Sequence, residues 1–135
     1  MRTNTSLTVY NRVIIDRETR YQRTVIKKVF FQEKQASNRL VSGFQEADKV
    51  ITLIPMKHQA TRQYKPFKEF NNLKDKENYF TLQNEDIIVK GDIDYEIKGD
   101  SLKEIEKLYP VFRITSVDTY DFGSKHMQHI KVGAK

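Results

Sequence analysis

The amino-acid sequence predicts a mainly β fold, a small antiparallel β-barrel or sandwich with one or two short helices and a long inserted loop. Short segments rich in β-branched and aromatic residues recur along the chain, and turn residues separate them at distances that allow antiparallel pairing. Only one segment has a complete set of helix signals. The 135 residues suffice for one core and are too few for two, so we expect a single domain over residues 1–135.

The first half of the chain is expected to form a long hairpin and a third strand. Residues 7–15 (LTVYNRVII) and 21–31 have the composition of strands and flank the turn segment DRETR. Neither face of residues 21–31 is cleanly apolar, which indicates a bulge or a twist. A polar segment follows at 35–48, and residues 49–56 (KVITLIPM) then predict a strand that Pro55 ends or keeps at an edge.

Residues 57–78 are the longest polar segment and are predicted to be the inserted loop. Within them, Pro66 is expected to open a short helix whose Phe67, Phe70 and Leu73 form an apolar stripe. A loop of this length in a compact domain is usually functional or mobile. The segment is therefore the first candidate for a binding role.

The second half of the chain is predicted to contribute further strands at residues 79–82, 87–89, 92–97, 111–122 and 127–132. The strand at 87–89 (IIV) is expected to be buried. Ser101 and Glu104 have the spacing of a capping box and predict a helix that Pro110 ends. The last two strands are expected to join through a turn at Gly123 and Ser124.

Three carboxylates, Asp92, Asp94 and Glu96, alternate with apolar residues in the segment DIIVKGDIDYEI. A period of two puts them on the water face of a strand and their apolar neighbours on the core face. A calcium loop counted from Asp92 would need Gly at the sixth position and Glu at the twelfth, where the chain has Ile97 and Lys103. We therefore interpret the carboxylates as a solvated strand face and predict no metal site here.

No catalytic, metal-binding or cofactor-binding residue is predicted. His126 and His129 are three residues apart on an extended segment and should point to opposite faces, which disfavours a zinc site. The chain has no cysteine, no G-x-S-x-G motif and no glycine-rich phosphate loop. It also has no apolar run of the length that crosses a membrane. We expect a protein that is not an enzyme, needs no cofactor and contacts no membrane.

Positive charge is concentrated in the first part of the chain. Residues 1–40 contain nine Lys or Arg against three Asp or Glu, and the remaining residues sum to zero within a net charge of +6. Such asymmetry is typical of contact with nucleic acid or with an acidic partner surface, although a solvated basic face is the commoner case. The candidate basic interface consists of Arg12, Arg17, Arg20 and Arg23.

Basic and aromatic residues interleave in the predicted loop, as they do in grooves that bind single-stranded nucleic acid. The candidate channel or partner residues are Lys57, Arg62, Tyr64, Lys65, Phe67, Lys68, Phe70, Lys74 and Lys76. In the alternative interpretation, Phe67 and Phe70 hold the loop against the core, and Glu69, Asp75 and Glu77 dilute its charge. An OB-like nucleic-acid-binding module therefore remains open beside a purely structural role.

Four segments carry a resemblance to a known group of proteins: TVYNRV (8–13), RTVIKKVFF (23–31), YFTLQNEDIIVKGDI (79–93) and ITSVDTYDFGSKHMQHIKVGAK (114–135). The chain resembles small proteins of unassigned function encoded among the virion structural genes of phages and prophages of Gram-positive bacteria. Its β-rich start, the turn and strand of EDIIVKG, and its final strand are also similar to the head-closure, or stopper, proteins of tailed phages.

The resemblance implies a structural virion protein of the head-to-tail connector, assembled in the bacterial cytoplasm and located in the neck. It implies a ring of identical subunits around the DNA channel, next to adaptor and tail proteins, with non-specific contact to packaged DNA. By placement, residues 57–78 would be the loop that faces the channel. A tail terminator or completion protein and a minor protein on the capsid side remain alternatives.

Overall fold

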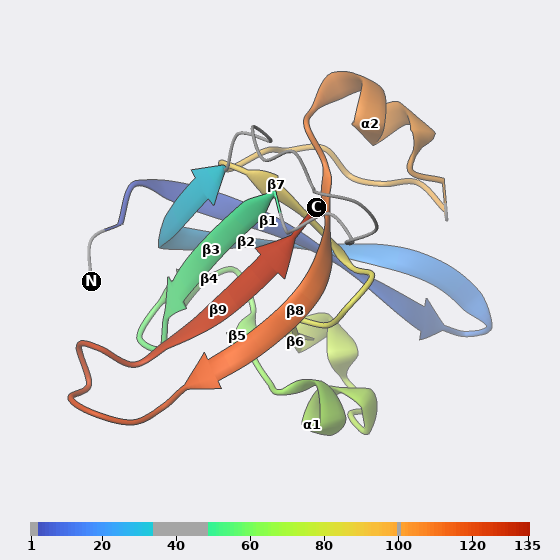
Figure 1. Cartoon of the computed structure of the whole chain (residues 1–135). Coiled ribbons are helices and arrows are strands. Elements are labelled where there is room, and N and C mark those ends of the chain that lie inside the picture. The colour runs from blue at the N-terminus through green and yellow to red at the C-terminus, as the bar shows by residue number, and fades with distance from the viewer. Residues whose placement is uncertain (1–2, 34–48, 100) are drawn as a thin grey trace, which may run out of the picture.

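The computed structural model describes residues 3–33, 49–99 and 101–135, and over these residues the protein is mainly β with two short α-helices (Figure 1). The strands are β1 (Thr5–Ile15), β2 (Glu18–Glu33), β3 (Val50–Pro55), β4 (Gln59–Ala60), β5 (Gln63–Tyr64), β6 (Tyr79–Phe80), β7 (Ile87–Lys90), β8 (Phe112–Tyr120) and β9 (His129–Ala134). The helices are α1 (Phe67–Asn71) and α2 (Lys103–Leu108), with a 3₁₀ turn, η1, at Lys76–Asn78. The predicted fold class is confirmed, and the polar segment at 35–48 lies outside the described residues.

Six of the described strands close into a ring through antiparallel pairs. The order around the ring is β1, β7, β8, β9, β3 and β2, and β2 pairs with β1 to complete it. β2 takes part twice because it bends: residues up to Val29 pair with β1, whereas residues 30–33 pair with β3. At the bend the register against β1 shifts, and Lys28 has a φ of 61°. The bulge predicted for this segment is therefore confirmed.

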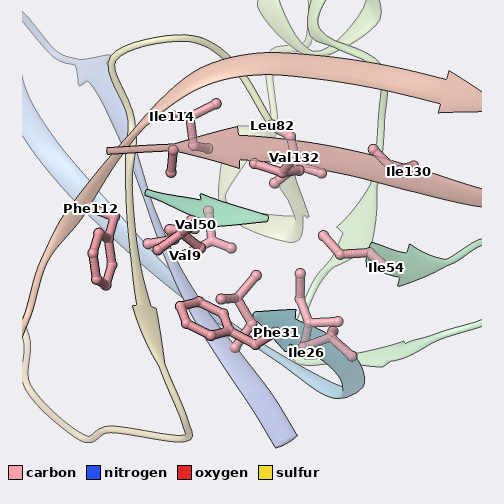
Figure 2. Close-up of a cluster of buried hydrophobic side chains, with 14 of the residues drawn as sticks. Val9, Ile26, Phe31, Val50, Ile54, Leu82, Phe112, Ile114, Ile130 and Val132 are labelled. Atoms are coloured by element: carbon pink, nitrogen blue, oxygen red, sulfur yellow. The ribbon is translucent and has the colours of Figure 1, made fainter. Parts of the chain in front are cut away.

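Apolar side chains from all six strands fill the interior of the ring (Figure 2). Val9, Ile26 and Ile88 are fully buried, and the rings of Phe31 and Phe112 meet with their centroids 6.1 Å apart. Burial of one such aliphatic side chain stabilises the fold by roughly 1.5–3 kcal/mol. We call this cluster the ring core. The strand predicted to be buried at 87–89 is buried on both faces, because Ile88 lies in the ring core and Ile87 and Val89 lie in a second cluster.

A second apolar cluster lies outside the ring, beneath α2. Tyr10 of β1 and Ile87 of β7 share it with Ile105 of α2, and all three are fully buried. The two clusters exist side by side because alternate side chains of β1 and β7 point to opposite faces of the sheet. The strands of the ring are therefore covered on this side by a further layer of chain.

Residues 91–98, which we call the strap, lead from β7 to α2 without forming a strand ladder. Exposed and less exposed side chains alternate along this segment, as predicted, but the prediction of a strand is wrong. Side chains of the ring hold the strap instead. The Thr8 hydroxyl accepts from the Ile93 amide at 3.2 Å, and the Tyr10 hydroxyl donates to the Tyr95 carbonyl at 2.6 Å. The strap crosses the face of β1 because the edge of β1 is already paired with β7.

The two helices differ in how well the sequence predicts them. α1 begins after Pro66, as expected. α2 follows the predicted position, but its N-cap is Leu102 and no side chain caps it, so the capping box assigned to Ser101 and Glu104 is wrong. Ser101 lies one residue too early for its hydroxyl to serve as the cap. Of its apolar side chains, Ile105 is fully buried, whereas Leu108 is 62% exposed.

The first and last strands, β1 and β9, each lie between two other strands of the ring. β1 pairs with β2 and β7, and β9 pairs with β3 and β8. A neighbouring chain therefore cannot add a strand beside residues 7–10 or 129–134, because both sides are already paired. Along these residues, contacts with a partner must therefore use side chains.

Candidate interaction surfaces

The predicted inserted loop, residues 57–78, is folded against the ring. The Thr61 amide donates to the Val25 carbonyl at 3.0 Å, and the Val25 amide donates to the Thr61 hydroxyl at 3.1 Å. The Gln22 amide group donates to the carbonyls of Lys76 and Tyr79 at 2.9 and 2.7 Å. β4 adds to the edge of β2, and β5 pairs in parallel with β6. The segment is therefore an integral part of the fold.

The aromatic residues of this segment divide into packed and exposed ones. The ring of Tyr64 lies 5.4 Å from that of Phe80, and His58 lies 5.8 Å from Phe80. Burial raises the pKa of Tyr64. Phe70 is 3% exposed, whereas Phe67 is 47% exposed. The packing interpretation is thus correct for Phe70 and wrong for Phe67, which remains at the surface. Tyr64 also packs against the body, which was not predicted.

Arg62 and Arg23, both candidate binding residues, form cross-links within the fold. The Arg62 guanidinium donates to the carbonyls of Glu77, at 2.8 Å, and of Arg23. The Arg23 guanidinium donates to Glu96 at 2.9 Å and to the Ile93 carbonyl at 3.0 Å. Burial lowers the pKa of Arg62, and the hydrogen bond to Glu96 raises the pKa of Arg23. Both arginines thus join β2 to the chain packed over it.

The lysines of the segment do not gather in one place. A groove of about 940 Å³ is lined by Lys57, Arg62 and Tyr64 together with neighbouring residues of 56–64 and Asn78. The other six candidates lie outside its lining. Lys65 lies over the ring of Tyr79, with its Nζ 5.6 Å from the centroid, and Lys76 donates to the Leu73 carbonyl at 3.1 Å. Lys68 and Lys74 are exposed.

The candidate basic interface follows the hairpin of β1 and β2, whose tip projects from the body (Figure 1). Arg17 lies in the two-residue turn at the tip, with a φ of 67°. Arg12 is opposite Tyr21 in the ladder, whereas Arg20 is opposite Val13, so Arg12 and Arg20 point to different faces. Arg20 also pairs with Glu18 at 3.1 Å in an exposed position. The four arginines therefore do not form one basic face.

A second hairpin, of β8 and β9, projects from the opposite side of the body (Figure 1). Its tip carries two large apolar side chains in water, Phe122 at 71% and Met127 at 64% exposure. At its base Tyr120 stacks on His129 with the ring centroids 4.9 Å apart. The sequence analysis above contains no prediction for this surface, although Phe122 beside the predicted Gly123–Ser124 turn is a signal for it. His126 at the same tip is exposed, and His129 bonds the Met127 carbonyl at 2.8 Å.

A buried carboxyl group, also missed by the sequence analysis, lies where β1 meets the turn before β7. Asp86 is 2% exposed and accepts hydrogen bonds from the Asn11 side chain at 2.9 Å and the Arg12 amide at 3.2 Å. Asn11 also donates to the Thr81 carbonyl at 2.7 Å. Burial raises the pKa of Asp86 to about 6, and the two hydrogen bonds oppose that shift.

Over residues 3–33, 49–99 and 101–135, no three His, Asp or Glu side chains are grouped so as to hold a metal ion. No helix in this part of the chain has the length and apolar character needed to cross a bilayer. Comparison with curated proteins and with solved structures finds no significant match. A family model does match residues 2–135, and the chain belongs to that family, described as a family of unknown function (DUF6751).

Proposed function

We propose that the chain is a structural subunit of a tailed-phage virion, one copy in a ring of identical copies at the connector between head and tail. The observation that carries the proposal is the pair of hairpins that project from opposite sides of one closed body (Figure 1). The first tip is mainly charged, with Arg17, Glu18 and Arg20 near the exposed Ile14, and the second carries two large exposed apolar side chains, Phe122 and Met127. Two unlike projections favour contacts between unlike surfaces of neighbouring copies.

Contacts between unlike surfaces repeat by rotation, and they close into a ring when the rotation divides a full turn. A subunit of such a ring needs a rigid body. The ring core makes the body rigid, because its side chains interdigitate within a closed sheet. Because both terminal strands are already paired within the subunit, contacts between copies through side chains are favoured over the exchange of a strand. The virion location rests on the resemblance of the four sequence segments given above.

The apolar tip is the surface whose loss should stop assembly. The double variant Phe122→Ser with Met127→Ser is expected to fold with an unchanged melting temperature, because both side chains are already in water. Phage particles assembled with the variant should lack the subunit and lose their DNA. The matched control is Leu108→Ser on α2, which removes a comparably exposed apolar side chain elsewhere and should leave assembly intact.

The decisive measurement is on purified particles of a phage that encodes the chain. Mass spectrometry should find the protein in the particles, and electron cryomicroscopy should trace it as a ring at the neck. Absence of the chain from purified particles would overturn the proposal. A ring at the tail end or inside the capsid would overturn the connector position and leave a virion role.

A further inference from the structure

We propose that the notch between the first hairpin and α2 binds phosphate groups of DNA. The notch is a hollow of about 740 Å³ lined by Arg12, Tyr21, Glu85, Ser101, Leu102, Lys103 and Arg113. The choice of DNA as the anion rests on the proposed function, which places the subunit around a DNA channel. The binding site itself rests on the geometry of the notch.

Three cationic side chains from distant parts of the sequence converge here. Arg12 belongs to β1, Lys103 begins α2, and Arg113 belongs to β8. Tyr10 pairs with Ile87 and Ile87 pairs with Arg113, so this row of three residues shares the outer face of the ring. Arg12 is two residues beyond Tyr10 on the same face. α2 packs on that face through Ile105 and brings Lys103 to the same hollow.

The charges of the notch favour an anion. Lys103 and Arg113 form no ion pair with any described residue, and Glu85 is the one carboxylate in the lining. An arginine fork and a lysine are the groups that bind phosphate oxygens most effectively.

The uncharged lining favours a nucleotide strand over an acidic peptide. Tyr21 is half-buried in the wall of the hollow, and Ser101 adds a hydroxyl at its rim. An aromatic ring beside cationic side chains is the combination that contacts both the sugar and the phosphates of a nucleic-acid strand. None of this could be read from the sequence, in which Lys103 and Arg113 lie outside the basic first part of the chain.

The test is binding of a short fluorescent DNA duplex to the full chain, followed by anisotropy over a range of salt concentrations. The variant Lys103→Gln with Arg113→Gln should bind about tenfold more weakly, and the slope of log K against log salt should fall in magnitude by about 1.8, which corresponds to two lost phosphate contacts. The control variant, Lys27→Gln with Lys125→Gln, removes the same charge from exposed positions outside the notch. It should change neither quantity.

Two results would overturn the inference. Equal weakening by both double variants would show that net charge alone, and no defined site, attracts the DNA. Binding of a polyglutamate peptide that depends on Lys103 and Arg113 more strongly than DNA binding does would identify an acidic protein segment as the occupant. Ring formation is followed on the same samples by light scattering and microscopy. If no ring forms, the proposed function is contradicted, and the anisotropy result still decides whether the notch binds phosphate groups.

Discussion

The ring core and the layer outside it are held by different interactions, although they share the same strands. In the ring core, apolar side chains interdigitate within a closed set of backbone ladders. Outside, the strap has no ladder, and the hydroxyls of Thr8 and Tyr10 and the guanidinium of Arg23 bind its backbone. Loss of one hydroxyl removes a whole attachment of the strap, whereas loss of one ladder bond leaves a ring strand paired on both sides. The outer layer should therefore open locally while the ring stays closed.

The largest effect is expected from a charge placed in the ring core. Ile88→Asp buries a carboxylate with no partner at a fully buried position, which should destabilise the protein by more than about 4 kcal/mol and prevent folding. Circular dichroism and solubility would check this. Ile14→Asp, at a position 66% exposed on the first hairpin, is the control and should fold normally. A soluble Ile88→Asp protein that unfolds cooperatively would contradict the assignment of this side chain to the core.

The next largest effect is expected from Asp86, whose carboxyl group is buried in the wild-type protein. The pKa of Asp86 is about 6 in the folded protein and 3.8 as an ordinary carboxyl, so the folded state binds the proton more tightly. The resulting stabilisation is complete below pH 3.8 and disappears as the pH rises through about 6. From pH 4 to pH 7 the free energy of unfolding should fall by on the order of 2 kcal/mol through this group.

Urea denaturation of the wild type and of the variant Asp86→Asn at several pH values checks this prediction. In Asp86→Asn this part of the pH dependence should be absent, because the side chain no longer titrates. The difference in unfolding free energy between the wild type and the variant should therefore change between pH 4 and pH 7. Parallel profiles for the two proteins would show that burial does not raise the pKa of Asp86.

A smaller effect is expected for the attachment of the strap. Tyr10→Phe keeps the buried ring but removes the hydroxyl that donates to the Tyr95 carbonyl, which should cost about 1 kcal/mol. Hydrogen exchange should become faster in the strap and in α2 but not in the ring strands. Tyr109→Phe is the matched control, because Tyr109 packs against the same cluster and its hydroxyl bonds no described residue. Equal acceleration throughout the molecule would mean that the two layers open together.

The smallest effect is expected on the water side of the strap. Asp92→Asn with Asp94→Asn removes two exposed carboxylates and should change the free energy of unfolding by less than about 0.5 kcal/mol. Urea denaturation with and without added calcium would check this. A larger loss of stability, or a calcium-dependent increase in the wild type alone, would reveal a role for these carboxylates that their exposure does not suggest.

The sequence predicts the strands of the ring well because their β-branched and aromatic residues are dense and turn residues bound them. It fails at the strap, since alternation reports which side chains are buried, and a segment held by Tyr10 and Arg23 alternates as a strand does. It fails at Arg62 for a related reason. A guanidinium that binds carbonyls of its own chain has the same sequence signature as one that binds a ligand. The notch could not be predicted, because strand pairing brings Arg12 and Arg113 together and the spacing of residues in the sequence does not show that pairing.

Closure of the ring also constrains how the chain acquires its structure during synthesis. β9 (His129–Ala134) fills the place between β3 and β8, so the earlier strands can form only an open sheet until these residues leave the ribosome. β1 must likewise wait for β7, because residues 7–10 pair with residues 87–90. Pairings this distant in sequence make folding slow, in the range of milliseconds to seconds. We expect the nascent chain to expose the edge of β3, and then that of β8, until β9 has emerged and paired with both.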